Sequence, residues 1–392
     1  MGRLLDATPE AELARLFSAE ELSEAGNGPR RAARLAARFA AKEACLKLFP
    51  RETALETLAA NDFSVSRDNY GAPWVTCSET AAFVLRRYRL DRIELSMAHD
   101  RTSAWAVALT VPMTTKVSLW GRILYRLLPI RRAVILENLR RAYGDRVPEA
   151  EIERLAAAHY AHLWRLMLEI LSYPLIPRAK RLKLVRVENL DAIARARDEG
   201  KGVIVLSGHF GNFEVSTTAG IASFPGLEEH FYFLRRPIKP QWLDAYVTRR
   251  FRKAGFGVLP PRGSLDWLLG RLADGDLVVF PFDQYAVGRD GIPVEFFGHS
   301  ARTLRSLALI AQASGAPVVP TASWREPNGK HVLHFDEALP YIECADFDEE
   351  VRRNTRAYNA ALERLIVRHP EQWWWVHQRW KPKRDRRSKV KT

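Results

Sequence analysis

The stretch KGVIVLSGHFGNFE, residues Lys201–Glu214, predicts the fold of the longer part of this 392-residue chain. Residues 203–206 form a short, continuous apolar run after a glycine, which is typical of a strand buried on both faces. Two small residues end the run, and a helix-like segment begins near Glu214. A strand, a tight turn and a helix start in this order indicate an open α/β sheet, in which ligands bind at the carboxyl ends of the strands.

This stretch also carries a candidate catalytic pair. His209 lies on the predicted turn, and Glu214 lies in the first turn of the predicted helix. We expect the carboxylate to fold back onto one imidazole nitrogen, which fixes the tautomer and leaves the other nitrogen free as a general base. The alternative is an ordinary turn histidine beside a carboxylate that the helix dipole favours. The catalytic interpretation gains support from Gly202, Gly208 and Gly211, which keep bulk away from the imidazole.

The same residues resemble a known family. GHFGNFE is similar to the HxxxxD/E block of glycerolipid acyltransferases, and within them it looks most like the late acyltransferases of lipid A biosynthesis. Later blocks resemble that family in the same order: Phe233–Pro237, Arg249–Lys253, Phe282–Gln284, Val294–Gly298 and Trp373–Trp380. The resemblance covers Leu119 to Trp380. It implies catalytic roles for His209 and Glu214, and substrate-binding roles for Gly211, Asn212, Arg236, Arg252 (or Arg250) and Asp283. Solvated surface charge is the alternative for the arginines.

Charge is unevenly distributed along the chain. Basic and acidic side chains balance at 15 each from Met1 to Pro112, so the whole excess of 14 positive charges follows Pro112. An anionic partner is therefore expected for the second part only. No nucleic-acid motif is present, which favours an anionic membrane surface or a phosphorylated lipid over nucleic acid. Three widely spaced cysteines give no metal or disulfide pattern and fit a reducing compartment.

Two segments strengthen the expectation of a membrane surface. Residues Val117–Ile130 predict a basic amphipathic helix with Trp120 on its apolar side, which suits a lipid interface. A buried helix with snorkelling arginines is the alternative. The basic tail, residues 381–392, would add attraction to an anionic leaflet. The chain shows no secretory signal and no run of about 18 apolar residues, so we expect peripheral attachment at the cytoplasmic face of the inner membrane.

The first part of the chain resembles a second family. Arg38–Lys47, RFAAKEACLK, is similar to a block of the holo-acyl-carrier-protein synthases, which are small 4'-phosphopantetheinyl transferases. Three further blocks follow the same family in order: Phe17–Leu22, Gly71–Pro73 and Ser96–Asp100. The resemblance implies Mg²⁺ at Glu43 and coenzyme A bound by Lys42, Lys47, Gly71, Pro73 and His99. Glu43 and Lys47 are also one helical turn apart, so one face can offer both charges, although a surface ion pair is the usual result of that spacing.

This first part also departs from the family it resembles. The family begins with a strand carrying G-x-D, whose Asp shares the metal; here Asp6 is the only early Asp. Ala98 replaces the second serine of the last block. Either an upstream start completes the site, or this domain has lost its metal and only docks carrier protein.

Together these patterns predict an α/β fusion protein. Residues 1–112 would form an α+β phosphopantetheinyl-transferase-like domain, and residues 116–380 an α/β acyltransferase domain with a largely parallel sheet. The expected reaction moves an acyl chain from acyl carrier protein, or acyl-coenzyme A, to a hydroxyl of a lipid or glycolipid. The acceptor could be a lipid A precursor, a lysophospholipid or another lipid, and the acyltransferase itself would need no cofactor.

Overall fold

The computed structural model describes residues 8–100, 103–144, 146–224, 226–227, 229–234, 239–259 and 265–381. They form two compact units: one takes the chain up to Thr114 together with residues 145–147, and the other takes the remainder. We call them the front unit and the back unit. Asp6, Arg236 and the basic tail after Lys381 lie outside the described residues.

The front unit mixes short helices with two β-hairpins. Its elements are α2 (Glu10–Leu13), α3 (Ala19–Ala25), α4 (Arg31–Leu46), α5 (Arg51–Glu56), η1 (Ala60–Asp62), β1 (Phe63–Arg67), β2 (Pro73–Cys77), α6 (Glu79–Arg87), β3 (Leu90–His99) and β4 (Ala104–Pro112). β1 pairs with β2, and β3 pairs with β4, both antiparallel. One face of α4 joins the buried apolar cluster that contains Cys45, Phe63 and Val84. The predicted α+β class is confirmed.

The back unit alternates helices and strands. It begins with α7 (Leu119–Leu127), α8 (Arg132–Tyr143), α9 (Glu149–Ser172), η2 (Tyr173–Leu175), α10 (Arg178–Arg181), β5 (Val185–Glu188), α11 (Leu190–Asp198), β6 (Val203–Ser207), α12 (Phe213–Gly220), η3 (Ile221–Ser223) and β7 (Phe231–Leu234). It continues with α13 (Gln241–Lys253), β8 (Phe256–Leu259), α14 (Leu265–Ala273), β9 (Leu277–Pro281), η4 (Gly288–Asp290), β10 (Gly291–Phe296), β11 (His299–Leu304), α15 (Ser306–Ser314), β12 (Val318–Arg325), β13 (His331–Phe335), α16 (Phe347–Ile366) and η5 (Pro370–Gln372).

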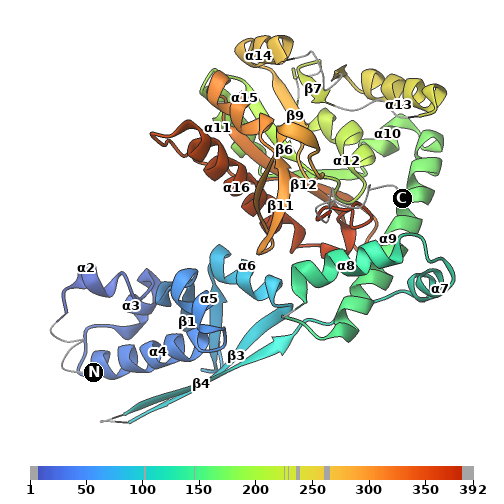
Figure 1. Ribbon diagram of the computed structural model, residues 1–392. Helices are drawn as coiled ribbons and strands as arrows, with labels where there is room; N and C mark the ends of the chain where they lie inside the picture. The colour runs from blue at the N-terminus through green and yellow to red at the C-terminus, as the bar shows by residue number, and fades with distance from the viewer. Residues whose placement is uncertain are drawn as a thin grey trace, which may run out of the picture. The chain divides into compact units, whose positions relative to one another are not determined.

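A seven-stranded sheet organises the described part of the back unit, in the order β5-β13-β12-β6-β9-β7-β8. All its neighbouring strands run parallel except β12 and β13. β6 lies in the middle, between β12 and β9 (Figure 1). Successive strand residues point to opposite faces, and Val203, Ile204, Val205 and Leu206 are all buried, so both faces are covered. The predicted strand and the largely parallel sheet are confirmed.

Several elements of the back unit were not predicted from the sequence. β8 and β13 are four and five residues long, and the β10–β11 hairpin pairs outside the large sheet. Within the described residues, no helix combines the length and the apolar character needed to cross a membrane.

The aromatic segment near the end of the described chain is largely buried. Trp373, Trp375 and Trp380 are buried, and so is the guanidinium of Arg379. That guanidinium donates to the carbonyl of Arg302 and to Thr303 Oγ1. These tryptophans belong to the core.

Candidate active site

A histidine and an aspartate meet at the carboxyl edge of the sheet. Ser207 of β6 pairs with Pro281 of β9, so His209 and Asp283 each lie two residues beyond the last paired positions of neighbouring parallel strands. His209 Nδ1 lies 2.9 Å from Asp283 Oδ1, and the backbone N–H of His209 donates to Asp283 Oδ2 at 2.7 Å. A carboxylate only accepts, so Nδ1 carries the proton and Nε2 is left as a base.

The electrostatics of this pair favour charge on both partners. Burial lowers the pKa of the His209 imidazole, but the charge of Asp283 and the hydrogen bond to it outweigh burial and raise the pKa above its ordinary value. Burial raises the pKa of Asp283, but the charge of His209 and the bonds from His209 and Trp373 outweigh it and hold the pKa below its usual range. The His209 side chain is 25% exposed and that of Asp283 only 3%, so of the two side chains only the imidazole is open to solvent.

Glu214 does not orient His209, contrary to the sequence-based expectation. Its Oε1 lies 2.9 Å from Arg250 Nη2 on α13, and the described residues contain no hydrogen bond between Glu214 and the imidazole. Burial raises the pKa of Glu214, partly offset by the charge of Arg250. The partner of the imidazole is Asp283 and not Glu214, because the parallel pairing of β6 and β9 places the Asp283 carboxylate directly against Nδ1.

Three segments hold the turn after β6 in place. Gly208 packs so closely on Asp283 that a Cβ there would lie 3.2 Å from the Asp283 Cβ. Gly211 has a φ of +51°, and its own Cβ would lie 2.6 Å from the carbonyl oxygen of Ser323 on β12. Trp373 donates from Nε1 to Asp283 Oδ2 at 3.0 Å. The glycines therefore allow backbone and carboxylate to approach, rather than clear space around the imidazole.

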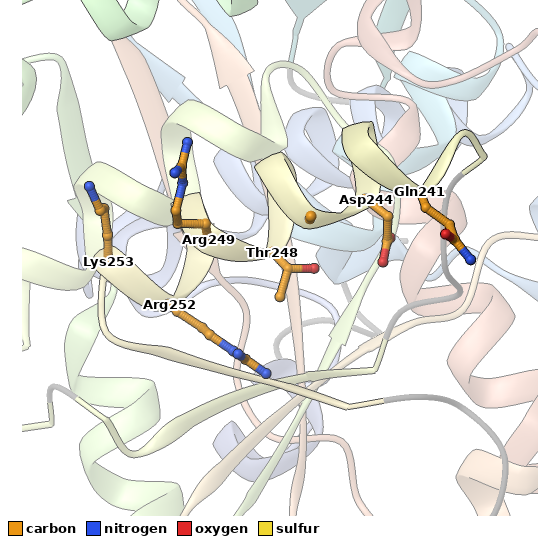
Figure 2. A pocket seen from close by; sticks show the side chains of 7 residues that line it. Gln241, Asp244, Thr248, Arg249, Arg252 and Lys253 are labelled. Carbon is orange, nitrogen blue, oxygen red and sulfur yellow. The ribbon is translucent and has the colours of Figure 1, made fainter.

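The arginines expected to bind substrate lie apart from the pair. Arg252 is on α13, where it lines an open hollow of about 600 Å³ with Arg249, Thr248 and Lys253 (Figure 2). Neither His209 nor Asp283 lines this hollow. Arg250, two residues before Arg252, turns toward Glu214 instead. Arg236 lies outside the described residues, so its role stays a prediction.

The front unit uses one of its expected ligand residues as a core residue. Lys42 on α4 is fully buried, and its ammonium reaches Glu21 Oε2 at 2.8 Å, the Phe63 carbonyl at 2.5 Å and the Ala60 carbonyl at 3.2 Å. An ammonium has three N–H donors, and all three are used. Burial lowers the pKa of Lys42, and Glu21 opposes that effect. The expectation that Lys42 binds coenzyme A is therefore wrong, since it lies on the inner face of the helix.

The other expected ligands of the front unit lie at its surface. Glu43 and Lys47 form an i,i+4 ion pair at 3.7 Å, with side chains 44% and 77% exposed. Gly71, Pro73 and His99 lie at the β1–β2 turn, the start of β2 and the end of β3. Among the described residues, no group of three His, Cys, Asp or Glu side chains could hold a metal. Glu43 alone, with an ammonium as neighbour, does not fit a Mg²⁺ site.

Comparison with known proteins identifies both units. Residues 104–382 match the family model described as bacterial lipid A biosynthesis acyltransferase, and residues 2–109 match the 4'-phosphopantetheinyl transferase superfamily. The lipid A biosynthesis palmitoleoyltransferase of Escherichia coli is 28% identical over 257 residues, 64% of this chain and 79% of the relative.

Two further relatives match the two units separately. The phosphatidylinositol mannoside acyltransferase of Mycolicibacterium smegmatis is 24% identical over 62% of this chain and 77% of its own length. The holo-[acyl-carrier-protein] synthase of Salinispora arenicola is 38% identical over 96 residues, 24% of this chain and 75% of its own length. The chain belongs to the bacterial lipid A biosynthesis acyltransferase family and carries a holo-acyl-carrier-protein-synthase-like domain in front of its acyltransferase domain.

Proposed function

We propose that the back unit moves an acyl chain from a thioester donor to a hydroxyl of a lipid or glycolipid, with His209 as general base and Asp283 as its positioning partner. The observation that carries this proposal is the 2.9 Å contact between His209 Nδ1 and Asp283, which leaves Nε2 open at the carboxyl edge of the sheet. A base with a raised pKa and a buried carboxylate behind it suits proton transfer near neutral pH.

The reaction proceeds by direct transfer. Nε2 takes the proton of the acceptor hydroxyl as its oxygen attacks the thioester carbonyl carbon. The tetrahedral intermediate collapses, the carbon–sulfur bond breaks, and the thiolate takes the proton back from the imidazolium. Asp283 stabilises the imidazolium between these two steps because it is buried against Nδ1.

The relatives support the proposed classes of donor and acceptor. The matched acyltransferases are named for lipid A and phosphatidylinositol mannoside, so a glycolipid hydroxyl is the proposed acceptor. The front unit, similar to a holo-[acyl-carrier-protein] synthase, favours acyl carrier protein over acyl-coenzyme A as donor.

Mass spectrometry of the lipid products tests this reaction. The full chain is incubated with each donor in turn and with a lipid A precursor, a phosphatidylinositol mannoside or a lysophospholipid. We expect a product heavier by one acyl chain for a glycolipid acceptor. Absence of transfer to all three acceptors would refute the reaction, and transfer to the lysophospholipid alone would refute the glycolipid assignment.

We further propose that the back unit binds the membrane through α7 and the second half of α9. These two helices pack on each other. Their exposed large apolar side chains are Leu119, Trp120 and Leu127 on α7 and Trp164, Met167, Leu168 and Leu171 on α9. Those of α9 are spaced three, four and seven residues apart, so they share one helix face. Arg122 and Arg126 are exposed on α7 and supply attraction to anionic lipid headgroups.

Vesicle binding tests this surface. Leu127→Ser is expected to weaken binding to anionic vesicles about tenfold, because one leucine side chain contributes about 1.5–3 kcal/mol on burial in an apolar phase. Leu55→Ser is the matched control, since Leu55 of the front unit is 72% exposed and Leu127 is 71% exposed. Binding should also fall with added salt, because the Debye length is only about 8 Å at physiological ionic strength. Equal losses in the two variants would contradict the proposed surface.

For the front unit we propose docking of the carrier protein with slow phosphopantetheine transfer. Support comes from its match to the phosphopantetheinyl transferase superfamily together with the lone carboxylate at Glu43. Coenzyme A would meet Lys47 and His99, which are exposed, and not Lys42.

A further inference from the structure

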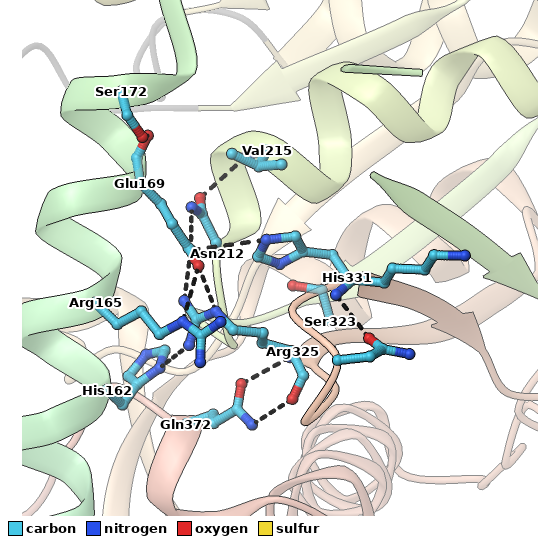
Figure 3. Close-up of polar contacts among 12 residues, drawn as sticks. His162, Arg165, Glu169, Ser172, Asn212, Val215, Ser323, Arg325, His331 and Gln372 are labelled. Carbon is cyan, nitrogen blue, oxygen red and sulfur yellow. Dashed lines mark hydrogen bonds and ion pairs between the residues drawn. The ribbon is translucent and has the colours of Figure 1, made fainter. Parts of the chain in front are cut away.

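An ion pair between a buried arginine and a partly buried glutamate lies behind the turn that carries His209. Glu169, near the end of α9, faces Arg325, the last residue of β12 (Figure 3). Arg325 Nε and Nη2 donate to the two carboxylate oxygens of Glu169, each at 2.5 Å. Burial raises the pKa of Glu169, but the bonds from Arg325 and Asn212 and the nearby positive charge outweigh burial and lower it. Glu169 is therefore a carboxylate at neutral pH.

Asn212 joins this ion pair to the turn. Its side chain is fully buried, its Nδ2 donates to Glu169 Oε2 at 3.0 Å, and its Oδ1 accepts the N–H of Val215 at 3.1 Å. Oδ1 therefore caps the start of α12, while Nδ2 anchors the turn to α9. A side-chain amide can accept through its oxygen and donate through its nitrogen at the same time, which an ionised carboxylate cannot do. The orientation of the amide is fixed, because the flipped amide would set an oxygen against a carboxylate.

Besides the Asn212 cap and one bond from the N–H of Phe210 to the carbonyl of Gly208, the turn is held by hydrogen bonds to other segments. The carbonyl of His209 accepts from Trp374, that of Phe210 accepts from Ser323 Oγ, and the N–H of Gly211 donates to the Gln372 carbonyl. Gln372 in turn bonds the backbone of Arg325 through both ends of its side-chain amide. Arg325 thus contacts Glu169 through its guanidinium and the C-terminal segment through its backbone.

The charges around Glu169 leave Arg325 as its main partner. His331 Nε2 is 3.7 Å from Glu169, and His162 Nδ1 is 3.4 Å from Arg325. Burial lowers the pKa of His331 to about 4 and that of His162 well below its ordinary value, so both are neutral. Arg165 lies 3.6 Å from Glu169 but is half exposed. The pair is thus close to neutral as a whole, and Glu169 Oε2 also accepts from Asn212.

We propose that Asn212 and Glu169 are positioning residues that hold His209 at the distance and angle needed for proton transfer. This inference rests on the proposed function, since it assigns no contact with substrate. Misplacing a reacting group by about 1 Å can cost roughly 10²-fold in rate. Breaking the Asn212–Glu169 bond is therefore expected to lower kcat about 10- to 100-fold with little change in KM.

A reversal of the hydrogen bond tests the proposal. Asn212→Asp keeps the cap of α12 but sets two carboxylates against each other. For this variant we expect the whole decrease in kcat, about 10- to 100-fold. Combining Asn212→Asp with Glu169→Gln moves the negative charge from position 169 to position 212. The side-chain amide at position 169 can then donate to the carboxylate at position 212, so the hydrogen bond is restored with its direction reversed. This double variant is expected to recover most of kcat. Glu350→Gln is the matched control, because Glu350 is a buried, hydrogen-bonded carboxylate outside the turn and the network.

A second readout keeps the result independent of the reaction. Hydrogen–deuterium exchange of the peptide spanning residues 207–215 should speed up in Asn212→Asp, return toward wild type in the double variant and stay unchanged in Glu350→Gln. If the wild type transfers no acyl chain to any acceptor, the proposed function fails, and the exchange pattern still decides the positioning role. Unchanged exchange and kcat in Asn212→Asp, or no recovery in the double variant, would overturn the inference.

Discussion

Each unit of the chain contains a close pair of side chains of opposite charge, and the two pairs differ in the hydrogen-bonding atoms that they leave without a partner. In the front unit, the Lys42 ammonium contacts Glu21 and two backbone carbonyls, so all three of its N–H donors have a partner. Glu21 also accepts the backbone N–H groups of Ser18 and Val65. His209 and Asp283 in the back unit use only Nδ1 of the ring, and the described residues contain no partner for Nε2. A saturated pair stabilises a fold, whereas a pair with one open nitrogen can also handle a proton.

The largest effect on activity is expected when the His209 imidazole, with its open Nε2, is removed. His209→Ala should lower acyl transfer about 10²- to 10⁴-fold, the usual contribution of a positioned base. His299→Ala, at an exposed histidine of β11, is the control and should stay within a few-fold of wild type. Circular dichroism of both variants checks the fold. A His209→Ala rate close to wild type would remove the imidazole from the mechanism.

Removing one partner of the saturated pair should act on stability instead. Lys42→Met leaves the Glu21 carboxylate buried without its cation, and breaking a buried pair in this way costs about 3–5 kcal/mol. Lys47→Met breaks only the exposed pair with Glu43 and should change stability by less than about 0.5 kcal/mol. Denaturant titration, with hydrogen exchange of α4 as the local probe, measures both. Equal losses would show that the Lys42 pair is no more important than a surface contact.

The pH dependence of acyl transfer separates Asp283 from Glu214. The base must be neutral, and Asp283 raises the pKa of His209, so the rate of the wild type should rise with pH through a value above the ordinary histidine pKa. Asp283→Asn removes the negative charge, and burial alone then shifts this inflection to lower pH. Glu214→Gln should leave the inflection in place because Glu214 lies against Arg250. An inflection that moves with Glu214 and not with Asp283 would restore the pairing expected from the sequence.

The smallest effect is expected for Glu43. The full chain with Mg²⁺, coenzyme A and an apo carrier protein should convert the carrier slowly, and Glu43→Gln should change that rate little, since one carboxylate beside an ammonium is a poor site for Mg²⁺. The mass of the carrier protein reports conversion. Fast conversion that Glu43→Gln abolishes would show that the front unit assembles a working metal site.

Much of the back unit could be predicted because its signals are local. The apolar run before Ser207 and the small residues after it specify a buried strand and a turn, and the turn places His209 at the carboxyl edge of the sheet. Asp283 also follows an apolar strand, so the sequence contained the signal that both residues lie at one edge. Strand order was not readable, because adjacency of β6 and β9 depends on how the whole sheet assembles.

Helix α4 of the front unit shows the same limit at shorter range: its sequence predicts the helix but not which charged side chain faces the core. Lys42 and Glu43 are neighbours in the sequence, but successive helix residues differ in direction by about 100°, so one is buried and the other exposed. The block Arg38–Lys47 predicted the helix itself. Which of its charges faces the core depends on Glu21, which α3 brings to the inner face.

The sequence alone thus determined the fold classes, the central strand β6 and the turn that carries the imidazole, because apolar periodicity, glycines and turn residues act over a few neighbouring positions. Only the tertiary structure decided which carboxylate reaches that imidazole. Asp283 lies 74 residues away along the chain and meets His209 through the parallel pairing of β6 and β9, while Glu214, five residues away, is drawn to Arg250. Proximity in the sequence does not place a side chain, since its direction depends on the backbone and on the charges packed around it.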